Sequence, residues 1–163
     1  MTIVEKSWFN AIWFQITWFS CVLGRDDWLL LTLALMAFHY WAVSDLRLEL
    51  RRVLPCLVLG LGVDFLLTLL GVFNFGDQLF PLWMVCLWCV FPTALPRAMA
   101  FLAKSGWRPV VLGAIAPLNY LAGQKFGAVT LPLGEVNTMI LLVPLWMIML
   151  PVMVRFSEYQ SQS

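Results

Sequence analysis

The stretch that decides the fold reads Val53-Leu-Pro-Cys-Leu-Val-Leu-Gly60-Leu-Gly-Val-Asp64-Phe-Leu-Leu-Thr68-Leu-Leu-Gly71-Val-Phe73. A helix that crosses the hydrocarbon core of a bilayer needs about 20 mostly apolar residues. This stretch has that length and carries a single charged side chain, Asp64. Its apolar residues do not alternate with polar ones as they do in the strands of membrane barrels. The stretch therefore predicts a membrane-spanning helix, in which all backbone groups pair internally.

The composition of the whole chain agrees with this prediction. Of its 163 residues, 62% are hydrophobic and 12% are charged, whereas soluble domains are nearly half apolar and about a quarter charged. A soluble fold of this size has too little interior to bury the surplus. We expect an all-α, polytopic transmembrane bundle of six helices, forming one integral membrane domain over residues 1–163, with spans at about 7–23, 28–44, 53–73, 80–101, 109–127 and 136–154.

The basic residues predict the orientation of these spans. With the N-terminus in the cytoplasm, eight of the 10 Lys and Arg residues lie on the cytoplasmic side, and Arg25 and Lys125 lie outside. Cytoplasmic loops are enriched in Lys and Arg, so both termini are expected to be cytoplasmic. Trp28 and Trp83 begin returning helices, which predicts that they lie at the outer membrane interface.

Three outer turns resemble one another, at Gly24, Gly76 and Gly127. In each turn the Gly is followed by three residues, then by a large apolar residue, then by Leu or Pro, and then by Leu, and the last two turns share a Phe-Gly start. The pattern predicts three consecutive helical hairpins. Two explanations account for this similarity. One is a common repeat. The other is convergent turn chemistry, in which Gly follows one helix and Pro starts the next.

Asp64 is the strongest candidate for a functional residue, because an ionisable group inside a span is costly. Asp64 should point into the bundle, because it shares one helix face with the small residues Gly60, Thr68 and Gly71. We expect Gln15 and Asn119 to lie at its depth, so that Asp64 either accepts hydrogen bonds from them or stays protonated near neutral pH. A structural carboxyl that only joins helices is an equally good interpretation.

The fifth span carries Pro117 beside Asn119 and Tyr120. Proline removes a backbone donor and interrupts the helix. A broken helix that lines a cavity is one outcome, and a packed kink is the other. The candidate ligand-binding residues are therefore Asp64, Gln15, Asn119 and Tyr120, for a proton, a cation or a small amphiphile.

Other chemistry has little support in the sequence. His39 is the only histidine, and no nucleophile elbow or phosphate-binding loop is present. Cys86 and Cys89 have redox-motif spacing but lack the βαβ context of such motifs. The sequence thus predicts no catalytic residue, no metal, no cofactor and no nucleic-acid partner. A carboxyl, His39 and a tyrosine meeting at one membrane interface would instead favour a lipid-active enzyme.

Several fragments resemble a family of small bacterial inner-membrane proteins known as domain of unknown function 2878. They are Asn10-Ala-Ile-Trp-Phe-Gln15, Val22-Leu-Gly24, Asp64, Phe80-Pro-Leu-Trp83, Cys86-Leu-Trp88, Tyr120-Leu-Ala-Gly123 and Gly127-Ala128. The resemblance implies an inner-membrane location but identifies no catalytic residue. It also implies an association with lipid-modifying enzymes. The chain would then have an alternative role, as a non-catalytic accessory protein for membrane lipid modification or envelope stress. Its partners would be membrane lipids and a lipid-modifying enzyme.

Overall fold

The computed structural model describes residues 1–159, and within them the chain is helical, with no β-strand. Short 3₁₀ turns at Ile3–Glu5 and Ala100–Lys104 flank the main helices. If α5 and α6 are counted as the two halves of one broken helix, the bundle has the six helices that the sequence predicts. The elements are α1 (Ser7–Phe19) with a π-helical turn (Ser20–Gly24), α2 (Leu29–Ala42), α3 (Leu46–Leu69), α4 (Leu82–Ala94), α5 (Arg108–Ile115), α6 (Leu118–Lys125) and α7 (Glu135–Tyr159).

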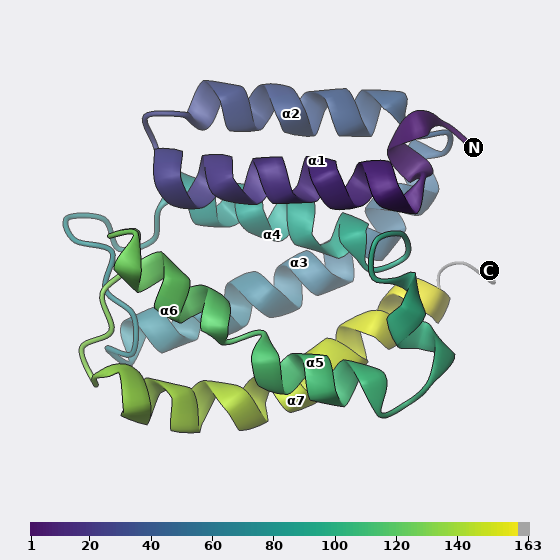
Figure 1. Ribbon diagram of the computed structural model, residues 1–163. Helices are drawn as coiled ribbons and strands as arrows, with labels where there is room; N and C mark the ends of the chain where they lie inside the picture. The colour runs from purple at the N-terminus through teal and green to yellow at the C-terminus, as the bar shows by residue number, and fades with distance from the viewer. Residues whose placement is uncertain (160–163) are drawn as a thin grey trace.

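The chain runs up and down as three antiparallel hairpins, α1 with α2, α3 with α4, and α5–α6 with α7 (Figure 1). Helix α4 lies behind α1, and α5 packs along α7. The N-terminus and the last turns of α7 lie at one end of the bundle, and the turns 25–28, 70–81 and 126–134 lie at the other (Figure 1).

Two helices, α3 and α7, are long and apolar enough to cross a membrane, and α2 and α4 are shorter apolar helices. Large hydrophobic side chains are exposed along most of the helices. In water such a surface would be unfavourable, because soluble proteins rarely expose large contiguous apolar patches. The fold therefore places apolar side chains both in its core and on its outside.

Helix α3 is displaced from the predicted span 53–73 at both ends. It begins at Leu46, because the carboxyl of Asp45 accepts a hydrogen bond from the backbone N–H of Leu48 at 2.9 Å and caps the helix. It ends at Leu69, because Gly71 adopts a left-handed conformation with a φ of 74°. The Val72 N–H then bonds to the Leu67 carbonyl at 2.9 Å, as in a Schellman motif.

Helix α4 ends at Ala94, well before the predicted end of the fourth span at 101. Pro96 follows closely and has no backbone N–H to donate to the carbonyl four residues earlier, so the α-helical hydrogen-bond pattern stops here, and the Leu95 N–H already bonds to the Pro92 carbonyl at 3.3 Å. The chain turns there and enters the 3₁₀ segment at Ala100–Lys104. By contrast, the π-helical turn extends α1 to Gly24, so this helix covers the whole predicted range 7–23.

The outer turns are joined to one another. Arg25 Nη1 donates to the Gly127 carbonyl at 2.9 Å, and Gln78 Nε2 donates to Asp26 Oδ2 at 2.7 Å. An isolated bridge pairs Asn74 with Thr130. At the end of the bundle opposite the N-terminus, the turns are therefore bonded to one another.

Gly76 and Gly127, which match in the sequence pattern of the turns, have different structural roles. Gly127 has a φ of 71° and ends α6 through the Ala128 N–H to Gly123 carbonyl bond at 2.8 Å, which repeats the arrangement at Gly71. Gly76 lies inside a turn and ends no helix. The structural equivalent of Gly127 is Gly71. In the isolated bridge, Asn74 lies three residues after Gly71 and Thr130 lies three residues after Gly127.

The two tryptophans that were expected at the outer interface, Trp28 and Trp83, differ in how exposed their side chains are. Trp28 is half exposed, as an interfacial anchor would be. Trp83 is only 4% exposed, and its indole packs edge-on against Phe75 with ring centroids 5.9 Å apart. Trp83 therefore points into the bundle and is not an exposed anchor, and its depth in the membrane stays a prediction.

Candidate functional site

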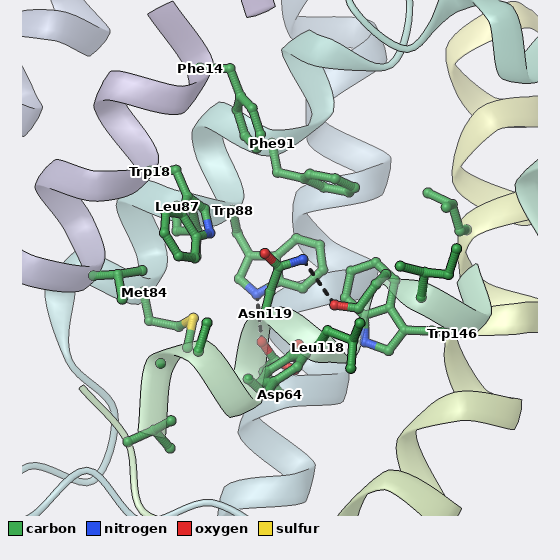
Figure 2. Close-up of a pocket in the computed structure, with 18 of the residues that line it drawn as sticks. Phe14, Trp18, Asp64, Met84, Leu87, Trp88, Phe91, Leu118, Asn119 and Trp146 are labelled. Carbon is green, nitrogen blue, oxygen red and sulfur yellow. Dashed lines mark hydrogen bonds between the residues drawn. The ribbon is translucent and has the colours of Figure 1, made fainter. Parts of the chain in front are cut away.

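A cavity of about 470 Å³ lies between α1, α4 and the broken helix α5–α6, with α3 and α7 behind it. Its walls are mostly aromatic and aliphatic (Figure 2). All four residues that the sequence nominated contribute to it. The lining is Phe14, Gln15, Trp18, Val22, Asp64, Trp83, Met84, Leu87, Trp88, Phe91, Met99, Leu112, Ile115, Ala116, Leu118, Asn119, Tyr120, Ala122, Gly123, Val129, Trp146 and Leu150.

Asp64 forms the polar floor of this cavity and is 1% exposed. Its Oδ2 accepts a hydrogen bond from Trp88 Nε1 at 2.8 Å, and its Oδ1 accepts one from the Tyr120 hydroxyl at 2.9 Å. Figure 2 shows the indole of Trp88 directed at the carboxyl. An indole nitrogen can only donate, and an ionised carboxylate only accepts. The two donors therefore suit a carboxylate.

Two neighbours hold these donors in place. Gly60 lies one helical turn before Asp64, and the six-membered ring of Trp88 occupies the space that a Cβ of Gly60 would fill. The ring of Tyr120 stacks on Phe73 with centroids 4.8 Å apart. The predicted small-residue face thus exists at Gly60, where it accommodates the side chain of Trp88, but Gly71 lies beyond the end of α3 and does not belong to it.

Gln15 and Asn119 line the cavity but do not bind Asp64, so the predicted donors were wrong. Asn119 Nδ2 instead donates to the Ala116 carbonyl at 2.9 Å (Figure 2). The reason is local, because the break at Pro117 puts this carbonyl within reach of Asn119. Gln15 and Asn119 are exposed residues, whereas Trp88 and Tyr120 are buried beside the carboxyl.

The break itself is confirmed. Helix α5 ends at Ile115 and α6 begins at Leu118, with Pro117 between them. Gly113 lets α5 lie directly on α7, since a Cβ there would come within 2.4 Å of the Trp146 carbonyl oxygen. The interrupted segment faces the cavity through Ala116 and Leu118, so it is more than a packed kink.

Aromatic rings form the wall next to Asp64. The indoles of Trp88 and Trp146 are stacked with centroids 6.0 Å apart, and Phe91 lies edge-on to Trp146 at 5.9 Å. Such ring faces carry partial negative charge. The site thus combines a carboxyl, apolar walls and electron-rich ring faces.

A second buried polar cluster was not predicted as a site. Glu49 Oε1 is 2.9 Å from His39 Nε2, and both Glu49 oxygens are bonded by the guanidinium of Arg97, at 2.9 and 2.7 Å. Arg97 also donates to the Thr93 carbonyl at 3.0 Å. The indole of Trp13 stacks on His39 at 4.4 Å. The cluster joins α2 and α3 to the turn after α4.

This cluster bears on the enzyme hypothesis. A carboxyl and His39 do meet, but the Tyr40 hydroxyl donates to the Cys89 carbonyl at 2.7 Å and does not join them. Arg97 neutralises the carboxyl, and none of His39, Glu49 and Arg97 lines the cavity at Asp64. The geometry is that of a buried ion pair that connects helices.

The four cysteines are free, and Cys86 is not joined to Cys89. Within residues 1–159, no group of three or more His, Cys, Asp or Glu side chains could hold a metal ion. The polar chemistry of the described chain is therefore concentrated at Asp64 and at Glu49.

Comparison with known proteins gives one assignment. Neither the curated proteins nor the solved structures contain a significant match to this chain. The family described as "Protein of unknown function (DUF2878)" matches residues 7–152. Since this match covers most of the chain, including every residue that lines the cavity, the protein belongs to that family.

Proposed function

We propose that this chain is a multi-pass protein of the bacterial inner membrane, with both termini in the cytoplasm, that binds a small amphiphile in the cavity beside Asp64. The orientation is supported by the basic residues. Eight of the 10 Lys and Arg residues belong to the N-terminus, to the first two turns of α3, to the connection after α4 and the start of α5, and to the last turns of α7. These segments lie at one end of the bundle (Figure 1), and the cytoplasmic side of membrane proteins is enriched in basic residues.

The observation that carries the binding proposal is the composition of the cavity. Its volume of about 470 Å³ falls within the range of small-molecule sites, which are mostly apolar with a few placed polar groups. Here the placed groups are the carboxyl of Asp64 and the hydroxyl of Tyr120 at the floor, with the amides of Gln15 and Asn119 at the edge. An amphiphile has the matching distribution of apolar and polar parts.

Inorganic cations fit this cavity less well. Ions such as Ca²⁺ and Mg²⁺ require six or more oxygen ligands, counting waters. Around Asp64 the structure offers an indole and a phenol, both of which donate hydrogen bonds to the carboxyl. The cavity also has far more room than a proton site needs. We therefore favour the amphiphile over the proton and the inorganic cation.

The position of the exposed amides supports entry from the bilayer. Gln15 on α1 and Asn119 on α6 are exposed and also line the cavity, and Ile115 and Leu118 beside them are about half exposed. Exposed polar side chains at membrane depth are unfavourable without a partner. The polar part of an amphiphile that enters between α1 and α6 would supply a partner for the amide of Gln15 and for the amide oxygen of Asn119, whose Nδ2 already donates to the Ala116 carbonyl.

Photolabelling tests this proposal. The purified protein is reconstituted with a long-chain alcohol that carries a diazirine in its chain, irradiated and mapped by peptide mass spectrometry. We expect adducts on the cavity-lining parts of α4 and α6. Ala122→Trp fills the cavity and should remove these adducts, whereas Ala34→Trp, the same change on an exposed position of α2, should leave them. Labelling of lipid-facing α2 residues serves as the internal standard.

The opposite result would favour the accessory role. If adducts on α4 and α6 are no more frequent than those on α2, and Ala122→Trp does not change them, the cavity binds no amphiphile. The polar residues would then only join helices, as expected of a protein that holds a lipid-modifying enzyme.

A further inference from the structure

Asp64 has no counter-charge within the described residues. The ion pairs found in residues 1–159 both involve Glu49, with His39 and Arg97. The partners of Asp64 are instead Trp88 and Tyr120, which are uncharged hydrogen-bond donors. A carboxylate that is removed from water without a cation is costly, even when it is hydrogen-bonded.

The space next to this carboxyl is suited to a positive charge. Four indoles line the cavity, those of Trp18, Trp83, Trp88 and Trp146, together with phenyl rings and the ring of Tyr120. Cations are attracted to ring faces, best to those of Trp, and quaternary ammonium groups are recognised by cages of such rings. No Lys or Arg of the chain lines the cavity to occupy this position.

We infer that the amphiphile bound in this cavity is an organic cation, with its ammonium group among the indoles and facing Asp64, and its apolar part along the walls towards α1 and α6. This inference rests on the proposed function and specifies the ligand class of the same site. The arrangement leaves lone pairs available on Asp64, because a carboxylate can accept about four hydrogen bonds and two are used. A bound ammonium group would complete a neutral pair in the low-dielectric interior.

The hydrogen bonds fix the carboxyl for this role. Trp88 donates to one oxygen and Tyr120 to the other, so the carboxyl is held from two sides before any ligand arrives. Trp88 also presents its ring to the cavity, which makes it both an orienting donor and part of the cage. The stacking of Trp88 on Trp146 extends the cage to α7.

The test is a competition against the diazirine-bearing alcohol with two matched amphiphiles. Dodecyltrimethylammonium carries a positive charge, and dodecyldimethylamine N-oxide has the same chain and nearly the same head but no net charge at neutral pH. If the cation pairs with Asp64, it should displace the label at a concentration about tenfold lower than the N-oxide, as expected for a desolvated cation among aromatic rings and a carboxylate.

Asp64→Asn keeps the size and hydrogen-bonding ability of the side chain but removes its charge. We expect this variant to bring the two half-inhibitory concentrations together, while the N-oxide competes as it does with the wild-type protein, which shows that the cavity remains intact. Asp64→Leu should lower the stability more than Asp64→Asn does, since it leaves two buried donors unpaired.

The outcomes separate the two proposals. Equal competition by both amphiphiles against the wild-type protein would overturn the inference of a cationic ligand and leave amphiphile binding in place. Labelling of the cavity that neither amphiphile reduces would overturn both. The wild-type comparison decides between these outcomes even if a variant does not fold.

Discussion

The six-membered ring of Trp88 lies directly against the Cα of Gly60, so that a Cβ added to Gly60 would be 2.1 Å from the ring atom Cζ3. This contact joins α3 to α4 one helical turn from Asp64. It sets the position of the indole whose nitrogen donates to the Asp64 carboxyl at 2.8 Å. The absence of a side chain at residue 60 is therefore a condition for the polar floor of the cavity.

Gly60→Ala should displace this indole and weaken its hydrogen bond to Asp64. Overpacking of a core position costs about 1–3 kcal/mol, and the thermal midpoint in detergent should fall accordingly. Gly62→Ala is the matched control, because it adds the same methyl group to the same helix where nothing lies within 4 Å. Equal midpoints for the two variants would contradict the packing described for Trp88.

Glu49→Gln should destabilise the protein strongly, because it leaves the buried guanidinium of Arg97 without its counter-charge. Removing one partner of a buried ion pair costs about 3–5 kcal/mol. Asp27→Asn, at an exposed position of the first outer turn, serves as the control and should have little effect. Thermal unfolding measures both, and a loss no larger than that of the control would show that the pair does not hold α3 to the turn after α4.

Glu5 should make the N-terminal turn sensitive to strong acid. Burial raises the pKa of Glu5, but hydrogen bonds from Ser44 and Thr2 outweigh it, and the pKa falls from 4.5 to about 2. A carboxyl with a lowered pKa contributes stability that is complete above the unfolded value, near pH 4.5, and is lost as the pH falls through about 2. NMR titration of the Glu5 carboxyl carbon should show this midpoint in the wild-type protein, and a midpoint near 4.5 would contradict the contact with Ser44.

Both termini should lie in the cytoplasm, because eight of the 10 basic residues are then on that side. Reporter fusions after Ser163 and within residues 74–79 should report opposite sides of the membrane. If both fusions report the same side, the proposed six-span topology is wrong, whatever the packing of the helices.

The sequence predicted the order of the helices, their pairing in hairpins and the inward direction of Asp64. These features follow from hydropathy and helix periodicity, which are local. Hydropathy did not predict the ends of α3, because it indicates which residues lie in the apolar layer of a membrane and not where the helix begins and ends. The ends depend on the cap at Asp45 and the left-handed Gly71.

The contacts between helices were harder to predict. Trp88 was missed as a donor because nothing local distinguishes it from the other tryptophans of the chain, and only its approach to Gly60 reveals its role. Trp83 begins a helix, which suits an interfacial and an interior side chain equally well. Arg97 entered only the count of basic residues that predicts the orientation, and Glu49 was not singled out, although the two bind each other across 48 residues of sequence.

Native mass spectrometry of the protein extracted from its own membrane tests the central claim most directly. The wild-type protein should retain one small amphiphile as an added mass, and Ala34→Trp should retain it too. Ala122→Trp, whose indole would occupy the cavity, should have lost it. Retention of the same mass by Ala122→Trp, or no bound amphiphile on the wild-type protein, would contradict the assignment of the cavity beside Asp64 as a binding site.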